Sequence, residues 1–157
     1  PAGGDALIVS TISSGKTLSP HLVRGTRWSI PTSPTASVIL AFSPEFVRER
    51  VLARRAERDP DRDVVLDPAK QRAEFADIQR RYYAFHEDPH ESGFSVLSAP
   101  IFDHAERLEA ALTIVMNRRP GTVNQETRYL KQLKETAVEI SRALGSVEMS
   151  DKMAVTL

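Results

Sequence analysis

The stretch from Gly93 to Met116 constrains the fold of this chain more than any other. Two apolar runs, Gly93–Asp103 and Leu108–Met116, are separated only by residues 104–107 (HAER). A turn of this length between two strand-forming runs is typical of an antiparallel hairpin. Successive side chains of a strand point to opposite faces, so such a hairpin presents two different surfaces.

The second run of this hairpin has one bulky side and one small side. The bulky side suits a core beneath helices and carries Leu108, Ala110, Leu112, Ile114 and Met116, whereas the small side carries Glu109, Ala111, Thr113 and Val115. The small side leaves room above the sheet, which indicates a ligand pocket. An ordinary half-buried hairpin, with a helix packed closely over the small residues, explains the pattern equally well.

The remaining segments predict strands before the hairpin and helices around it. Strands are expected at residues 6–12 and 21–30, the second bent at Gly25, and helices at 36–42, 44–57, 68–82 and 122–145. The third helix has an expected buried stripe of Ala69, Phe75, Ile78 and Tyr82, and Gly145 stands where a left-handed C-cap ends the fourth. Because no regular strand–helix–strand alternation appears, the sequence predicts an α+β domain with an antiparallel sheet flanked by helices.

Composition excludes several classes of function. The chain has 21 basic and 21 acidic residues and a formal net charge of +0, so it has no basic surplus for nucleic acid. It has no cysteine, which excludes disulfides, thiolate metal sites and cysteine nucleophiles. No apolar run reaches the roughly 18 residues of a membrane span, and no signal-peptide pattern opens the chain. We expect a cytoplasmic protein with no membrane partner.

The motif that most suggests catalysis is His86-Glu87-Asp88-Pro89-His90, which matches HExxH. In zinc proteases both histidines share one helix face, with the glutamate beside the bound water. Pro89 would disrupt that helix at a cost of about 3 kcal/mol or more. A looser metal site of His86, His90 and Glu91 stays open as an alternative. Polar loop residues at a sheet edge are the preferred interpretation, so we expect no metal and no other cofactor.

The start of the helix at 36–42 suggests an anion site built from backbone. Thr35 is the expected N-cap. The amide groups of Thr35, Ala36 and Ser37, at the positive end of the helix dipole, would suit a carboxylate without any charged side chain. The alternative is that Thr35 caps the helix and nothing binds there.

Five short segments form a set that is specific in order and spacing. They are residues 40–45 (LAFSPE), the helix start Asp67-Pro68, Gly93 followed by residues 99–103 (APIFD), residues 110–113 (AALT) and residues 139–145 (EISRALG). Over about residues 25–145 this set resembles the effector-binding domain of IclR-type bacterial transcription regulators. The first twenty-odd residues match poorly.

The resemblance implies a GAF-like fold and a small organic or aromatic acid as effector, bound between the sheet and the start of the helix at 36–42. We expect this effector-binding domain to occupy residues 1–145. Residues 146–157 have no clear pattern, and we expect them to form a C-terminal tail. In that family the domain follows a winged helix-turn-helix DNA reader. We expect that DNA-binding domain to be absent from this chain, whose first residue is Pro1. The residues of this chain would then contact DNA only indirectly, through the absent domain. The family's assemblies imply a homodimer or homotetramer.

Carried over by position, the resemblance assigns seven residues to the effector pocket: Pro34, Val38, His86, Phe94, Val96, Thr113 and Val115. The strand parity agrees, since Phe94 and Val96 share one face and Thr113 and Val115 lie on the small side derived above.

This chain departs from the family pattern at several of these positions. An acidic residue of the family is His86 here, a frequent cysteine is Val96 and a serine is Val115. We therefore expect a drier pocket, suited to an apolar or aromatic body with one acidic group. Two family glycines, at the end of the third helix and in the hairpin turn, are Tyr82 and Glu106.

The sequence thus predicts a non-enzymatic sensor that couples a small-molecule effector to DNA binding by a missing domain. Two other interpretations remain open. One is a metal-dependent hydrolase that uses His86, Glu87 and His90. The other is an oligomerisation module whose pocket is vestigial and filled.

Overall fold

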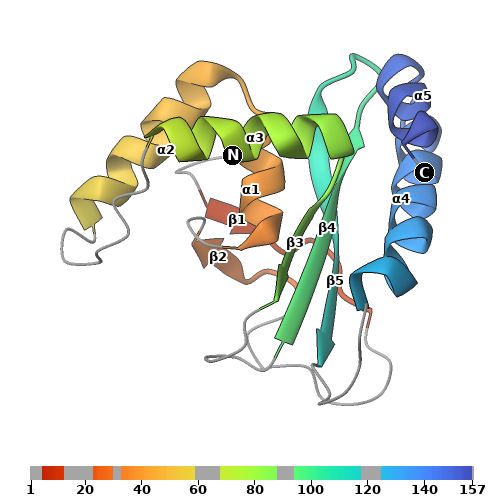
Figure 1. The fold of residues 1–157 in the computed structure, drawn as a ribbon, viewed down its shortest axis with the longest axis horizontal. Helices are drawn as coiled ribbons and strands as arrows, with labels where there is room; N and C mark the ends of the chain where they lie inside the picture. The colour runs from red at the N-terminus through yellow and green to blue at the C-terminus, as the bar shows by residue number, and fades with distance from the viewer. Residues whose placement is uncertain are drawn as a thin grey trace.

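The computed structural model describes residues 5–12, 23–29, 33–58, 68–87, 94–117 and 125–156. Five strands and five helices lie in this part of the chain, as Figure 1 shows. The strands are β1 (Asp5–Leu7), β2 (Arg27–Ser29), β3 (Ala84–Glu87), β4 (Phe94–Phe102) and β5 (Leu108–Asn117). The helices are α1 (Pro34–Ala41), α2 (Glu45–Arg58), α3 (Pro68–Arg81), α4 (Gln125–Ala143) and α5 (Glu148–Val155). The predicted α+β class is confirmed.

The central sheet is antiparallel, with the strand order β3-β4-β5. The predicted hairpin is β4 and β5, and their register shifts between Ile101 and Phe102. The carboxylate of Asp103 closes the turn because it accepts hydrogen bonds from the amides of Ala105 (2.8 Å) and Arg107 (3.0 Å). In the described residues β1 and β2 form a separate two-stranded sheet.

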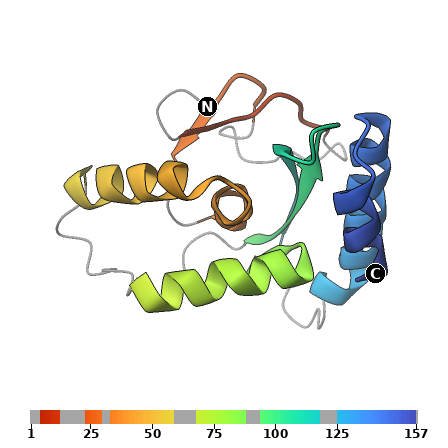
Figure 2. The same cartoon turned by 90° about the horizontal axis from the view of Figure 1, so that it is seen from above.

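Helices cover both faces of the central sheet. In Figure 2, α1 lies on one side of the strands and α4 and α5 lie on the other. The bulky residues of β5 pack with α4 residues in one core cluster, whereas Ala111 packs with α1 in a second. The predicted two-sidedness of the return strand is therefore confirmed, and its small side faces α1.

The N-terminal elements are shorter than predicted. Strands were predicted at 6–12 and 21–30, but in the described residues the ladder between β1 and β2 covers 5–7 and 27–29; residues 21, 22 and 30 of the prediction lie outside the described part. The bend at Gly25 is confirmed, since this residue has a φ of +89°. No helix in the described part of the chain is long and apolar enough to span a membrane.

Two expectations about the helices are wrong in detail. The N-cap of α1 is Ser33 instead of Thr35: its side chain accepts from the amide of Ala36, and Thr35 lies inside the helix. In α3 the stripe of Phe75, Ile78 and Tyr82 is buried as predicted, but Ala69 is exposed because it lies in the first turn, away from the core.

The C-terminal tail predicted at residues 146–157 is also wrong, because α5 occupies residues 148–155 and buries Ser150 and Met153. The preceding C-cap at Gly145 is confirmed, with a φ of +91°. The amide of Ser146 donates to the carbonyl of Ser141 and that of Gly145 to the carbonyl of Arg142. These two bonds are the pattern of a Schellman cap.

Candidate functional site

The register of the central sheet builds the α1-facing surface in rows that cross all three strands. His86 pairs with Val96, which pairs with Val115. The next row toward the β4–β5 turn contains Ala84, Ser98 and Thr113. Directly opposed residues of antiparallel strands point to the same face, so both rows lie beneath the layer that contains α1.

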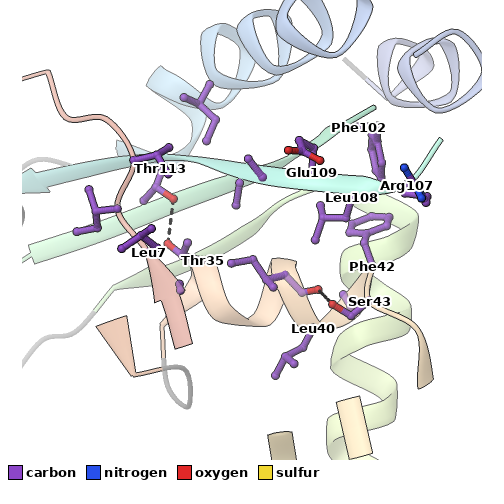
Figure 3. Close-up of a pocket in the computed structure, with 18 of the residues that line it drawn as sticks. Leu7, Thr35, Leu40, Phe42, Ser43, Phe102, Arg107, Leu108, Glu109 and Thr113 are labelled. Atoms are coloured by element: carbon purple, nitrogen blue, oxygen red, sulfur yellow. Dashed lines mark hydrogen bonds between the residues drawn. The ribbon is translucent and has the colours of Figure 1, made fainter. Parts of the chain in front are cut away.

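A chain of three hydroxyl groups joins α1 to this surface. The Oγ atom of Ser98 lies 2.9 Å from Oγ1 of Thr113, which lies 2.9 Å from Oγ1 of Thr35. Figure 3 shows the contact between Thr35 and Thr113. Ser98 donates its proton to the carbonyl of Leu112 at 3.3 Å. In each of the two hydroxyl pairs either group can be the donor. The chain ends at Thr35, whose oxygen has lone pairs that can accept a further hydrogen bond.

The backbone anion site predicted at Thr35, Ala36 and Ser37 is corrected by the capping of α1. The amide of Ala36 donates to the side chain of Ser33 at 3.3 Å, and the amide of Ser37 donates to the carbonyl of Ser33 at 3.0 Å. Both groups are thus used inside the helix. Thr35 contributes through its hydroxyl group, which points to the sheet.

A broad hollow of about 1740 Å³ opens beside this hydroxyl chain, between α1, β1 and β5. Figure 3 shows part of its lining, with Leu7 next to Thr35 and Thr113. Val115 also lines it, as does Arg27 of β2. Arg27 is exposed and forms no ion pair with any residue in the described ranges. Because Leu7 and Arg27 are opposed in the β1–β2 ladder, their side chains leave the same face.

The seven predicted pocket residues fall into three groups. Thr113 and Val115 line the hollow. Phe94 and Val96 are half-buried on the same face of β4, and His86 is exposed on the edge strand β3. Pro34 and Val38 are buried in the packing of α1, with Val38 0% exposed. Pro34 and Val38 therefore support the helix, and of the seven predicted residues only Thr113 and Val115 line the hollow.

Sequence reasoning missed Ser98 and Arg27 as site residues. The alternation of side chains along the strand could have predicted Ser98, because it lies two positions from Val96 and hence on the same face. Arg27 was not, because its place depends on how the β1–β2 ladder lies against α1.

Two carboxylates with strongly lowered pKa values line the far end of the hollow, at the β4–β5 turn. The pKa of Asp103 is lowered to about 2, chiefly by the amide and then by the guanidinium of Arg107. The pKa of Glu106 is lowered to about 2 by the amide of Val147, the hydroxyl of Ser146 and the amide of Met149. Both groups are used to hold the turn and α5, so we do not assign them to a ligand.

The alternative metal site rests on residues that are mostly outside the described part of the chain. Only His86 is described with its side chain; the side chain of Glu87 and all of His90 and Glu91 are not. Among the described residues, no group of three or more metal-binding side chains comes together.

Comparison with known proteins shows to which family the chain belongs. Residues 2–142 match the family described as bacterial transcriptional regulator IclR, C-terminal. The HTH-type transcriptional regulator KipR of Bacillus subtilis is 24% identical over 144 residues, which cover 91% of this chain and 57% of KipR. The DNA-binding transcriptional repressor YiaJ of Escherichia coli is 28% identical over 126 residues, which cover 79% of this chain and 45% of YiaJ.

A solved structure agrees with these relatives. The crystal structure of the Thermotoga maritima IclR protein superimposes with a TM-score of 0.76 at 25% identity, covering 93% of this chain and 59% of that one. The chain thus spans only about half the length of the regulators it matches. On the match over residues 2–142, the chain belongs to the IclR family of bacterial transcriptional regulators and corresponds to their C-terminal domain.

Proposed function

We propose that this domain senses a small organic acid, bound on the α1-facing surface of the sheet, and couples it to DNA binding by a domain outside this chain. The observation that carries the proposal is the hydroxyl chain Ser98–Thr113–Thr35, which borders the row of His86, Val96 and Val115 and the adjoining hollow. Polar groups at one end of an apolar surface are the usual arrangement of a small-molecule site.

The residues of this sheet face and of the adjoining hollow suggest which acid would suit the site. Val96 and Val115 provide an apolar floor, with Phe94 on the same face of β4. Burying an apolar or aromatic body there contributes about 25 cal/mol per Å². The oxygen of Thr35 can accept from a hydroxyl or amide group of the ligand. Arg27, without an ion pair in the described ranges, can hold a carboxylate through two parallel hydrogen bonds.

Coupling to DNA requires that the effector bind two arrangements of the protein with different affinity. The two relatives KipR and YiaJ, which are longer than this chain, are named as a transcriptional regulator and a transcriptional repressor. In this chain α1 is the element positioned to respond, since Thr35 contacts the sheet directly through Thr113. A ligand that forms a hydrogen bond with Thr35, or that breaks the hydrogen bond between Thr35 and Thr113, would change how α1 lies on the sheet. This is a sensing role, without catalysis.

Isothermal titration calorimetry of the chain against a library of small monocarboxylic acids tests the proposal. We expect at least one acid to bind, and Arg27→Gln to weaken that binding at least tenfold. Arg24→Gln is the matched control, because Arg24 is also exposed, lies three residues away and does not line the hollow. An acid whose affinity is the same in both variants and in Thr113→Val would place the effector elsewhere and contradict the proposal.

A further inference from the structure

A second hollow, of about 480 Å³, lies where the end of α3 meets α4 and the end of α5. Figure 2 shows the end of α3 beside α4 and close to the C-terminus. This volume is within the usual range for small-molecule sites. The described residues of its lining include three cationic side chains and no carboxylate: Arg80, Arg81, Tyr83, Leu130, Lys134 and Thr156.

Lys134 is the most unusual of these residues, because it is only 2% exposed. Its Nζ atom donates to the carbonyl oxygen of Thr156 at 2.6 Å and also to the hydroxyl group of that residue. Both acceptors are neutral, and no carboxylate pairs with Lys134 in the described part of the chain. A buried ammonium group without a counter-charge is costly. This burial lowers the pKa of Lys134.

The two arginines at the end of α3 share a single acid. A guanidinium nitrogen of Arg81 lies 2.7 Å from Asp77, and Arg80 pairs with the same carboxylate. The guanidinium of Arg81 also lies over the ring of Tyr83, 4.7 Å from its centroid. The Nε atom of Arg81 is buried and has no hydrogen-bond partner among the residues that the structure describes. Among the described residues, the three cations of this hollow thus have one paired carboxylate, that of Asp77, which binds the two arginines and does not line the hollow.

We propose that this second hollow binds a small organic dianion. Two negative charges would offset the surplus of Arg80, Arg81 and Lys134, and would give Lys134 a counter-charge, which no described residue provides. The ring of Tyr83 and the side chain of Leu130 provide apolar surface for the carbon skeleton. A dicarboxylate and a phosphate monoester share this chemistry. The site is separate from the hydroxyl chain, since it lies on the opposite side of the sheet, where α4 packs.

Calorimetric titration of the chain at low ionic strength with succinate and with glycerol 3-phosphate tests this proposal, with acetate as the singly charged comparison. We expect at least one dianion to bind at least tenfold more tightly than acetate, and the tighter of the two identifies the class. Arg80→Gln and Lys134→Met should each weaken binding at least tenfold. The side chain of Arg80 is 77% exposed, so its variant does not endanger the fold.

Lys131→Gln is the matched control, because Lys131 is on the same helix, is 74% exposed and does not line the hollow. It should leave the affinity within about twofold, and so should Val96→Trp on the other face of the sheet. If Lys134→Met does not fold, Arg80→Gln alone decides. Absence of binding by both dianions, or equal losses in Arg80→Gln and Lys131→Gln, would overturn the proposal.

Discussion

The hydroxyl oxygens of Thr35 and Thr113 lie 2.9 Å apart, although the two residues are separated by 78 positions in the chain. This contact fixes the first turn of α1 to the middle of β5. It also turns Thr113 toward the layer of α1 and away from that of α4, as the proposed pocket requires.

Replacing Thr113 by valine tests this contact. The substitution keeps the shape of the side chain and removes the link between Ser98 and Thr35. Two hydrogen bonds are lost, each with a usual net value of about 1 kcal/mol, so we expect the free energy of unfolding to fall by about 2 kcal/mol, as measured by urea denaturation. Thr113→Ser keeps the hydroxyl group and should retain acid binding. Equal loss of binding in both variants would mean that the methyl group, and not the hydroxyl group, matters.

Replacing Val96 by tryptophan should abolish the effector response and leave the fold intact. Val96 is half-buried between His86 and Val115, on the face where the ligand is proposed to lie. The larger ring would occupy that space. Calorimetry measures the lost binding and circular dichroism the retained fold. Binding that is unchanged in the folded variant would argue against this pocket.

The two described glycines with positive φ make a matched pair for stability. Gly145 and Gly25 have φ values of +91° and +89°, but a Cβ atom at Gly145 would lie 2.9 Å from Cβ of His104, whereas one at Gly25 would contact nothing within 4 Å. Gly25→Ala should cost about 1 kcal/mol from the backbone strain alone. Gly145→Ala should cost clearly more, because His104 must move. Thermal unfolding compares the two, and equal losses would show that His104 moves without cost.

The stability of the protein should depend on pH through Glu106. Its pKa falls from 4.5 to about 2 in the folded state, because the amide of Val147, the hydroxyl of Ser146 and further amides of α5 bind the carboxylate. A lowered folded pKa stabilises the fold above the unfolded value. We therefore expect stability to decline as the pH falls from about 4.5 toward 2. Asp103 titrates in the same window, so the test is a comparison of wild type with Glu106→Gln by denaturation at each pH. If the free energy of unfolding of both proteins changed equally with pH, Glu106 would not be a source of the pH dependence.

The sequence predicted the local elements of the fold well, because their causes are local. Alternation on the return strand gave the face of Thr113, and the glycine at position 145 gave the end of α4. It failed for α5, whose first turn has no side-chain cap of its own. Glu106 supplies that cap from 41 to 43 residues away, with amide–carboxylate distances of 2.8–3.1 Å. No local pattern reveals such a partner.

The two positions where the family resemblance implies glycine show the same limit. Tyr82 and Glu106 have φ values of +59° and +58°, which side chains adopt at a cost of about 1–3 kcal/mol. Tyr82 stacks on Phe42 with the ring centroids 5.6 Å apart, and Glu106 caps α5. These distant contacts offset the strain, and they became visible only in the structure. The error about the backbone anion site has a similar origin, since Ser33 is the N-cap that Thr35 was expected to be.

An amide-resolved NMR titration of the chain with benzoate, alongside benzyl alcohol, which lacks the charge, tests acid binding beneath α1. We expect saturable shifts at Thr35, Val96, Thr113 and Val115 with benzoate or another small acid from the library, and weaker shifts with the alcohol. Shifts confined to residues of α4 and α5, or none for any acid in the library, would contradict it.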